Sequence, residues 1–141
     1  MIDKFRETFR EEAEELLSQL EDVLLELETH PDDSELINAA FRAVHTIKGS
    51  AGMFGFENAG RFTHDLENLL DACRGGLRAV DSQVIDLSLR ARDKIRSMLA
   101  ETDGSSPFDV EAQALMAEFR AAVEDSSKQP LPAEPGKTGS G

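Results

Sequence analysis

The most informative part of this sequence is the stretch His45-Thr46-Ile47-Lys48-Gly49-Ser50-Ala51-Gly52-Met53-Phe54-Gly55-Phe56. Read as a helix, it places Lys48, Gly49 and Gly52 on the same face as His45. A glycine inside a helix costs about 1 kcal/mol relative to alanine, so two on one face need a reason. Either they let another helix of the chain pack closely, or they leave room for a partner that approaches His45 and Lys48.

A second cluster, His64-Asp65-Leu66-Glu67, lies in the next predicted helix, with His64 and Glu67 on one face. A nucleophilic imidazole needs its other nitrogen held, and a carboxylate that accepts a hydrogen bond from Nδ1–H does this. Two antiparallel helices would allow Glu67 to reach His45. The alternative is that Glu67 is a solvated charge on the helix surface.

Together the two motifs resemble those of histidine phosphotransfer domains, and in particular those at the N-terminus of chemotaxis histidine kinases of the CheA family. The resemblance covers roughly residues 5–123. It rests on the stretch quoted above and on the run His64-x-x-Glu67-Asn68-Leu69-Leu70-Asp71. A general phosphotransfer domain shares the first motif but often lacks the second, so the His-x-x-Glu pair indicates the chemotaxis kinase. Thr46 and Ser50 occupy positions that vary in the family.

This resemblance implies that His45 accepts a phosphoryl group from ATP in a separate kinase domain and passes it to an aspartate of a response regulator. The expected partners are therefore that kinase domain and receiver domains of the CheY-like or CheB-like kind. The resemblance also implies that Glu67 orients His45 and that Lys48 and His64 complete the hydrogen-bonding site. The partner is expected to dock over Gly49 and Gly52.

The sequence contains no P-loop and no kinase-type glycine-rich loop. We therefore expect a phosphoryl acceptor and donor with no ATP site and no cofactor of its own. ATP and Mg²⁺ would belong to the separate kinase domain, and any histidine kinase (phosphotransferase) label to the parent protein.

Three alternatives to a phosphotransfer domain of a chemotaxis kinase remain open. One is a stand-alone phosphorelay protein of the same family. Another is a metal-binding bundle using His45, His64 and Glu67, but such sites need about four inward carboxylates, and the inward stripes here are almost purely apolar. We expect no metal. The third is a structural dimerisation bundle, which gives no role to Lys48, Gly49 or Gly52.

Composition narrows the class of protein further. A chain of 141 residues is one domain's worth. No run approaches the roughly 20 apolar residues that span a bilayer, and no signal segment opens the chain, so we expect a cytoplasmic protein outside the membrane. The net charge of −13 argues against nucleic acid and anionic membranes as partners. Cys73 is the single cysteine, which excludes an internal disulfide, and we expect it to be buried.

Helical periodicity in five segments predicts an all-α fold, an up-and-down antiparallel four-helix bundle with a fifth C-terminal helix packed alongside. The first helix spans residues 2–29, the second begins at Asp32, Asp33 or Ser34, and the third spans 61–74 and ends at Gly75-Gly76. Asp81 begins a fourth helix that runs to about residue 101, and Ser106 or Asp109 begins a fifth.

The inward faces follow from the same periodicity. In the first helix the predicted stripe is Phe5, Phe9, Ala13, Leu16, Leu20, Leu24 and Leu27. In the fifth it is Ala112, Leu115, Met116, Phe119 and Val123. The basic residues of the fourth helix, Arg90, Arg92, Lys94 and Arg96, are expected on its surface.

The composition changes after Asp125. Residues 126–141 include three prolines and a single large apolar residue, Leu131, so this segment cannot offset the entropy of ordering. The sequence therefore predicts a phosphotransfer domain over residues 1–125 and a flexible linker or added tail over 126–141.

Overall fold

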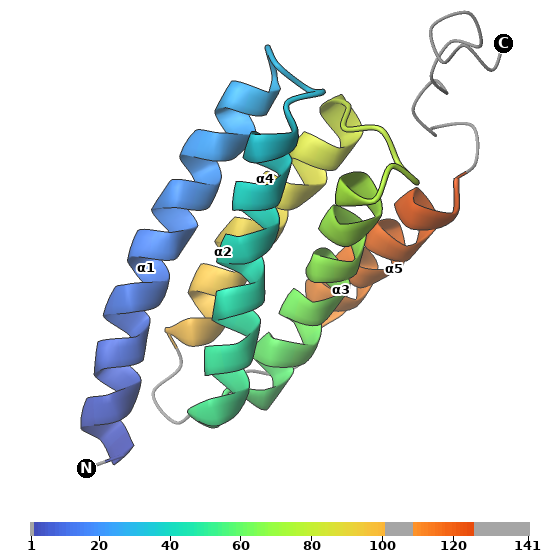
Figure 1. Cartoon of the computed structure of the whole chain (residues 1–141). Helices are drawn as coiled ribbons and strands as arrows, with labels where there is room; N and C mark the ends of the chain where they lie inside the picture. Colours follow the sequence, from blue (N-terminus) through green and yellow to red (C-terminus); the bar gives the residue numbers. More distant parts are fainter. Residues whose placement is uncertain (1, 101–108, 126–141) are drawn as a thin grey trace, which may run out of the picture.

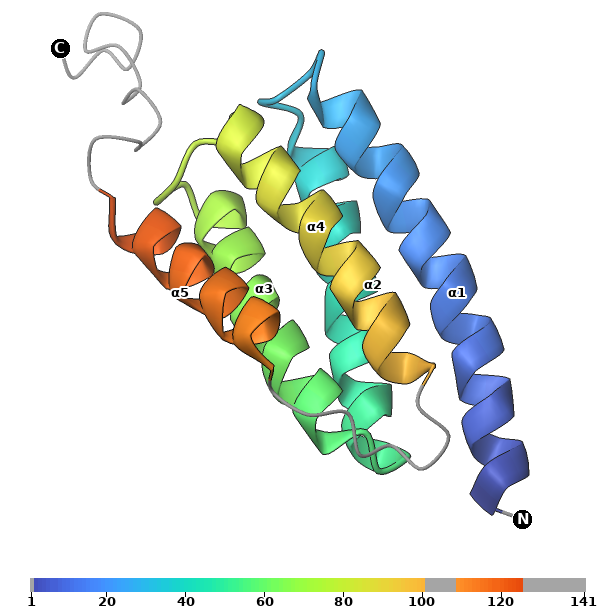
Figure 2. The same cartoon turned by 180° about the vertical axis from the view of Figure 1, so that it is seen from behind.

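The structure, a computed structural model, describes residues 2–100 and 109–125. Five α-helices account for most of them: α1 (Ile2–Leu27), α2 (Ser34–Met53), α3 (Glu57–Arg74), α4 (Ser82–Leu99) and α5 (Val110–Glu124). Over these residues there is no strand. The helices α1 to α4 form an antiparallel bundle, and α5 lies outside it against α3 and α4 (Figures 1 and 2). The predicted all-α bundle with a fifth helix alongside is confirmed.

Three of the helices begin at an aspartate that the sequence marks. The Asp33 carboxylate accepts hydrogen bonds from the backbone N–H groups of Glu35 and Leu36 at the start of α2. Asp81 and Asp109 cap α4 and α5 in the same way. Each cap satisfies backbone donors that the first helical turn leaves without a partner. The predicted starts at Asp81 and at one of the two candidates for α5 are therefore confirmed.

The turn between α2 and α3 is shorter than the sequence predicts. The third helix begins at Glu57 instead of residue 61, so only residues 54–56 separate it from α2. Gly55 makes this possible, because its φ of 87° lies in the left-handed region that side chains disfavour. A turn this short fixes α2 and α3 closely beside each other.

The amino-terminal half of α1 holds that turn in place. The Phe9 ring stacks on Phe54 at 5.5 Å between centroids and lies 5.6 Å from the ring of Phe56. The Arg6 guanidinium donates a hydrogen bond to the Phe54 carbonyl at 3.0 Å. Phe56 itself is fully buried. Contacts from α1 thus stabilise the geometry of α2 and α3, where all the predicted site residues lie.

Polar contacts fasten α5 to the bundle. Arg78 is buried in the loop before α4, and its Nε donates to the carbonyl of Ala122 at 2.8 Å. A cation at that position also complements the negative end of the helix dipole. At the other end of α5, Lys94 pairs with Asp109 and Glu111. In between, the Phe62 and Phe119 rings pack edge to face at 5.6 Å.

Several details of the sequence prediction are corrected. Phe5 is 51% exposed, and Leu17 occupies the buried position that Leu16 was expected to share. Lys94 is buried because α5 covers it, which the sequence of α4 alone does not reveal. Gly76, with φ of 81°, takes the left-handed conformation after α3, whereas Gly75 does not.

Two helices end earlier than the sequence predicts, and two further predictions fall outside the described residues. The helices α1 and α4 end at Leu27 and Leu99, each about two residues early. The alternative start at Ser106 and the expected linker at residues 126–141 lie outside the described part of the chain. Among the described helices, none is long and apolar enough to cross a membrane.

We predict that Phe56→Ala lowers the free energy of unfolding by about 3–5 kcal/mol, because it removes a fully buried ring between α1 and the α2–α3 turn. Urea unfolding followed by circular dichroism measures the change. Met53→Ala, at the last residue of α2 directly before this turn, is the control. Met53 is 77% exposed, so this substitution should stay within about 0.5 kcal/mol of the unsubstituted chain. Equal losses in the two variants would contradict the assigned role of Phe56.

Candidate functional site

The packing of α3 on α2 brings four predicted site residues into one cluster. His45 Nδ1 is hydrogen-bonded to Glu67 Oε2, and Lys48 Nζ donates to Glu67 Oε1 at 3.0 Å. His64 Nε2 lies 3.9 Å from the same Oε1 atom, within range of an ion pair but beyond a hydrogen bond. The Glu67 carboxylate is therefore the centre of the cluster, with two imidazoles and an ammonium around it.

Glu67 is buried, whereas the groups around it are more exposed. Its side chain is 8% exposed, whereas that of His45 is 59% exposed. The alternative of Glu67 as a solvated surface charge is therefore wrong. Gly60 on α3 packs directly against α2, because a Cβ there would lie 3.7 Å from the backbone nitrogen of Gly52 and 3.8 Å from the Lys48 carbonyl, in ordinary van der Waals contact. The backbones of α2 and α3 therefore come close together at this point.

The charge state of Glu67 follows from its surroundings. Burial raises the pKa of its carboxyl group, but hydrogen bonds from His45 and Lys48, and their positive charge, outweigh burial and leave the pKa below its ordinary value. The carboxylate is thus ionised at neutral pH and can only accept hydrogen bonds. The proton in its bond with His45 must then belong to Nδ1. In a neutral imidazole this leaves the Nε2 lone pair unprotonated and available as a nucleophile.

The two glycines of the motif border open space. A Cβ added to Gly49 or Gly52 would meet no atom within 4 Å outside its own helix turn. Among the described residues nothing packs against these two glycines, so the explanation that they let another described helix pack closely is wrong. Both positions are exposed beside His45, with Met53 further along the same helix end. This part of α2 therefore leaves open space beside the imidazole through which a second protein can approach.

Sequence reasoning missed an aromatic neighbour of His45. The Phe41 ring lies nearly parallel to the imidazole, with 5.7 Å between ring centroids and an interplanar angle of 12°. The guanidinium carbon of Arg74, in the last turn of α3, lies 3.9 Å from the centroid of the Phe41 ring. The sequence does contain a signal for this contact, because Phe41 precedes His45 by one helical turn and so lies on the same face of α2.

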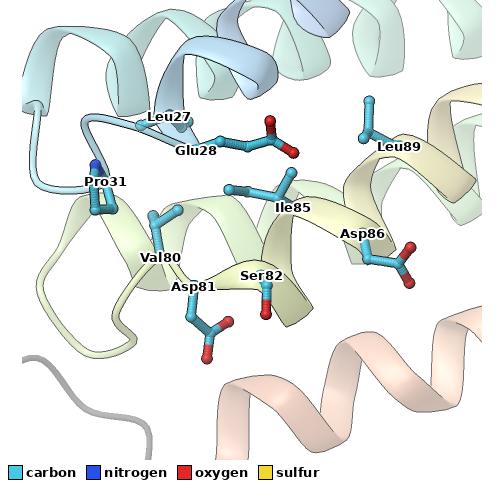
Figure 3. Close-up of a pocket in the computed structure, with 9 residues that line it drawn as sticks. All are labelled: Leu27, Glu28, Pro31, Val80, Asp81, Ser82, Ile85, Asp86 and Leu89. Carbon is cyan, nitrogen blue, oxygen red and sulfur yellow. The ribbon is translucent and has the colours of Figure 1, made fainter.

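Two hollows in the surface have different relations to the cluster. One, of about 550 Å³, lies between α2, α3 and α5 and shares Lys48, Gly52 and His64 with the site. Another, of about 670 Å³, lies between the end of α1 and the start of α4, with Leu27, Val80, Ile85 and Leu89 among its lining residues (Figure 3). That second hollow contains none of the predicted site residues.

Within the described residues, no group of three His, Cys, Asp or Glu side chains is placed to hold a metal ion.

Comparison with known proteins agrees with this geometry. The sequence matches the Hpt domain family over residues 4–105. The chain belongs to the Hpt domain family. It is 38% identical over 139 residues to the chemotaxis protein CheA of Klebsiella aerogenes, covering 95% of this chain and 21% of that protein. It is 44% identical over 98 residues to CheA of Salmonella typhimurium, covering 70% of this chain and 15% of the relative.

A solved structure extends the likeness to three dimensions. The phosphorylated P1 domain of CheA3 from R. sphaeroides, crystallised in complex with CheY6, superposes with a TM-score of 0.77. It is 28% identical, and the match covers 86% of this chain and 96% of that one. The Hpt domain described here thus spans only about a fifth or less of the length of the CheA relatives, but nearly all of a P1 domain.

The lowered pKa of Glu67 predicts that part of the folding stability of this Hpt domain depends on pH. Because the folded-state pKa lies below the unfolded value of about 4.5, the carboxylate contributes stability that is fully present above pH 4.5 and is lost as pH falls through the folded-state pKa. We expect the difference in unfolding free energy between the unsubstituted chain and Glu67→Gln to shrink as pH drops from 6 to 3. Urea unfolding at each pH measures it. A difference that stays constant over this range would contradict the assignment.

Proposed function

We propose that this chain is the phosphoryl-carrying domain of a chemotaxis histidine kinase. His45 accepts a phosphoryl group from ATP bound in a separate kinase domain and donates it to an aspartate of a response regulator. The observation that carries the proposal is the exposed imidazole whose Nδ1 is held by a buried, ionised carboxylate. Membership of the Hpt domain family and the likeness to CheA proteins support it independently.

The proposed chemistry needs little from the domain beyond a well-placed nucleophile. The Nε2 lone pair of His45 attacks the γ-phosphorus of ATP, an N–P bond forms, and the P–O bond to ADP breaks with its electrons leaving on ADP. In the second transfer an aspartate oxygen attacks the same phosphorus, and the N–P electrons return to Nε2. Phosphoryl transfer depends mainly on positioning and on charge stabilisation, so a small site suffices.

Glu67, Lys48 and His64 assist this chemistry in different ways. Glu67 holds the Nδ1–H tautomer and balances the positive charge that the ring acquires as the N–P bond forms. Lys48, which is 29% exposed, can turn from Glu67 toward the oxygens of the incoming phosphoryl group. His64 adds a second imidazole at the edge of the site, 54% exposed. ATP and Mg²⁺ would be held by the kinase domain, and the proposal assigns no cofactor to this chain.

The partners follow from the same proposal. The kinase domain is expected in the rest of the parent protein, because the CheA relatives are several times longer than this chain. A CheY-like or CheB-like receiver domain is the expected acceptor, supported by the P1 domain crystallised with CheY6. Both partners would dock over Gly49 and Gly52, where α2 leaves open space. Dependence on ATP places the proposed reaction in the cytoplasm.

The first test is phosphorylation itself. Incubation with ATP alone should leave the chain unmodified, whereas ATP, Mg²⁺ and the kinase core of a CheA protein should yield an adduct that is labile in acid and stable in base. His45→Gln should abolish the adduct while circular dichroism shows an intact bundle, since the His45 side chain is largely exposed. Radiolabelled ATP quantifies the transfer. An adduct that persists in His45→Gln, for example on His64, would overturn the proposal.

A second test addresses docking over the glycine face. Gly49→Leu should preserve or raise stability, because leucine is the better helix former and a Cβ at this position meets no neighbour within 4 Å. Transfer to a receiver domain should nevertheless fall at least about tenfold, because the side chain stands between the imidazole and the partner. Gln19→Leu, on the exposed side of α1, adds a similar side chain elsewhere and should transfer normally. Normal transfer by Gly49→Leu would move the docking surface away from this face.

A further inference from the structure

The imidazole of His45 has two neighbours that make different kinds of contact with it. Glu67 contacts the ring at its edge, through the hydrogen bond to Nδ1. Phe41 contacts its face, with the two rings nearly parallel at 12° and 5.7 Å between centroids. The edge contact selects the tautomer. The face contact has no part in that selection and calls for a separate explanation.

A single hydrogen bond leaves one motion of the ring free. Hydrogen bonds tolerate deviations of several tens of degrees before they weaken steeply. The imidazole can therefore rotate by such an angle about its Cβ–Cγ bond while its hydrogen bond to Glu67 persists. Nε2 lies off that axis, so each rotation changes the direction of the lone pair that must meet phosphorus. A parallel aromatic ring against the imidazole face opposes this motion, because tilting would break the stacking or drive the rings together.

We propose that Phe41 is a positioning residue that sets the plane of the His45 imidazole and so aims Nε2 at the phosphoryl group of a docked partner. This inference rests on the proposed function and adds to it. Glu67 determines which nitrogen is free, and Phe41 determines where that nitrogen points. Fixed direction matters when the partner is docked, since the line of attack is then set by the complex.

Arg74 supports Phe41 from the neighbouring helix. Its guanidinium lies over the Phe41 ring, 3.9 Å from the centroid, in the geometry of a cation–π contact. Asp71, one turn earlier in α3, accepts a hydrogen bond from Arg74 Nη2 at 2.6 Å and so restricts the guanidinium. The contacts form a series from Asp71 through Arg74 and Phe41 to His45. Arg74 should therefore act on His45 only through Phe41.

The test is steady-state phosphorylation of the whole chain by ATP and a CheA kinase core, with this chain as the varied substrate. Phe41→Leu keeps an apolar side chain but removes the flat ring. We expect its kcat to fall about tenfold, while KM changes by less than about twofold because docking is intact. Phe41→Tyr retains the ring and should restore kcat. Leu89→Ala, a half-buried leucine in α4 outside the site, controls for a loss of stability and should leave both constants unchanged.

Two further measurements separate positioning from other roles. Imidazole NMR of Phe41→Leu should retain the Nδ1–H tautomer but show a more mobile ring. Arg74→Gln should lower kcat to a lesser extent, and should add nothing in a chain that already carries Phe41→Leu.

The outcomes are distinct. A raised KM with normal kcat in Phe41→Leu would make Phe41 part of the docking surface and overturn the proposal, as would unchanged constants or an unchanged ring mobility. An additive effect of Arg74→Gln would remove Arg74 from the series. If the unsubstituted chain acquires no phosphoryl group on His45, the proposed function itself fails. That result differs from a failure of the Phe41 proposal, in which the unsubstituted chain is phosphorylated normally.

Discussion

The buried carboxylate of Glu67 is the contact on which the site depends. A carboxylate that is 8% exposed would be costly to leave without partners, and it is held by an imidazole and an ammonium from the adjacent helix. These contacts place a negative charge under an exposed ring. The same arrangement fixes the ring's tautomer and leaves Nε2 on the side of solvent and of any partner.

That contact requires α3 to lie very close to α2, and several unrelated features of the chain contribute to this. Gly60 lies where the backbones of the two helices come together, and Gly55 allows a three-residue turn between them. Phe9 and Arg6 of α1 hold the turn from outside. Such packing contributes directly to chemistry here, because a shift of about 1 Å between the helices would change the bond between Glu67 and His45.

Three glycines of α2 and α3 have different surroundings, and the sequence shows no difference between them. Gly60 faces α2, where a Cβ would make ordinary van der Waals contact with the backbone of that helix. Gly49 and Gly52 face open space, so their missing side chains weaken the helix without any gain inside the domain. The loss is offset only if something outside the domain uses the space. This contrast is the physical reason for assigning the docking surface to that face of α2.

The sequence by itself determined the helices and their aspartate caps, because periodicity and capping are local properties. Motif spacing left Glu67 open between a partner of His45 and a solvated charge, and it was the resemblance to histidine phosphotransfer domains that predicted Glu67, Lys48 and His64 around His45. It could not determine that Lys94 is buried under α5, that Phe5 remains exposed, or that Phe41 and Arg74 belong beside His45. Nor could it exclude that Gly49 and Gly52 allow another of the described helices to pack closely. Each of these depends on which helix faces which, and only the tertiary structure sets that, since the same apolar stripes permit several rotations of one helix against another.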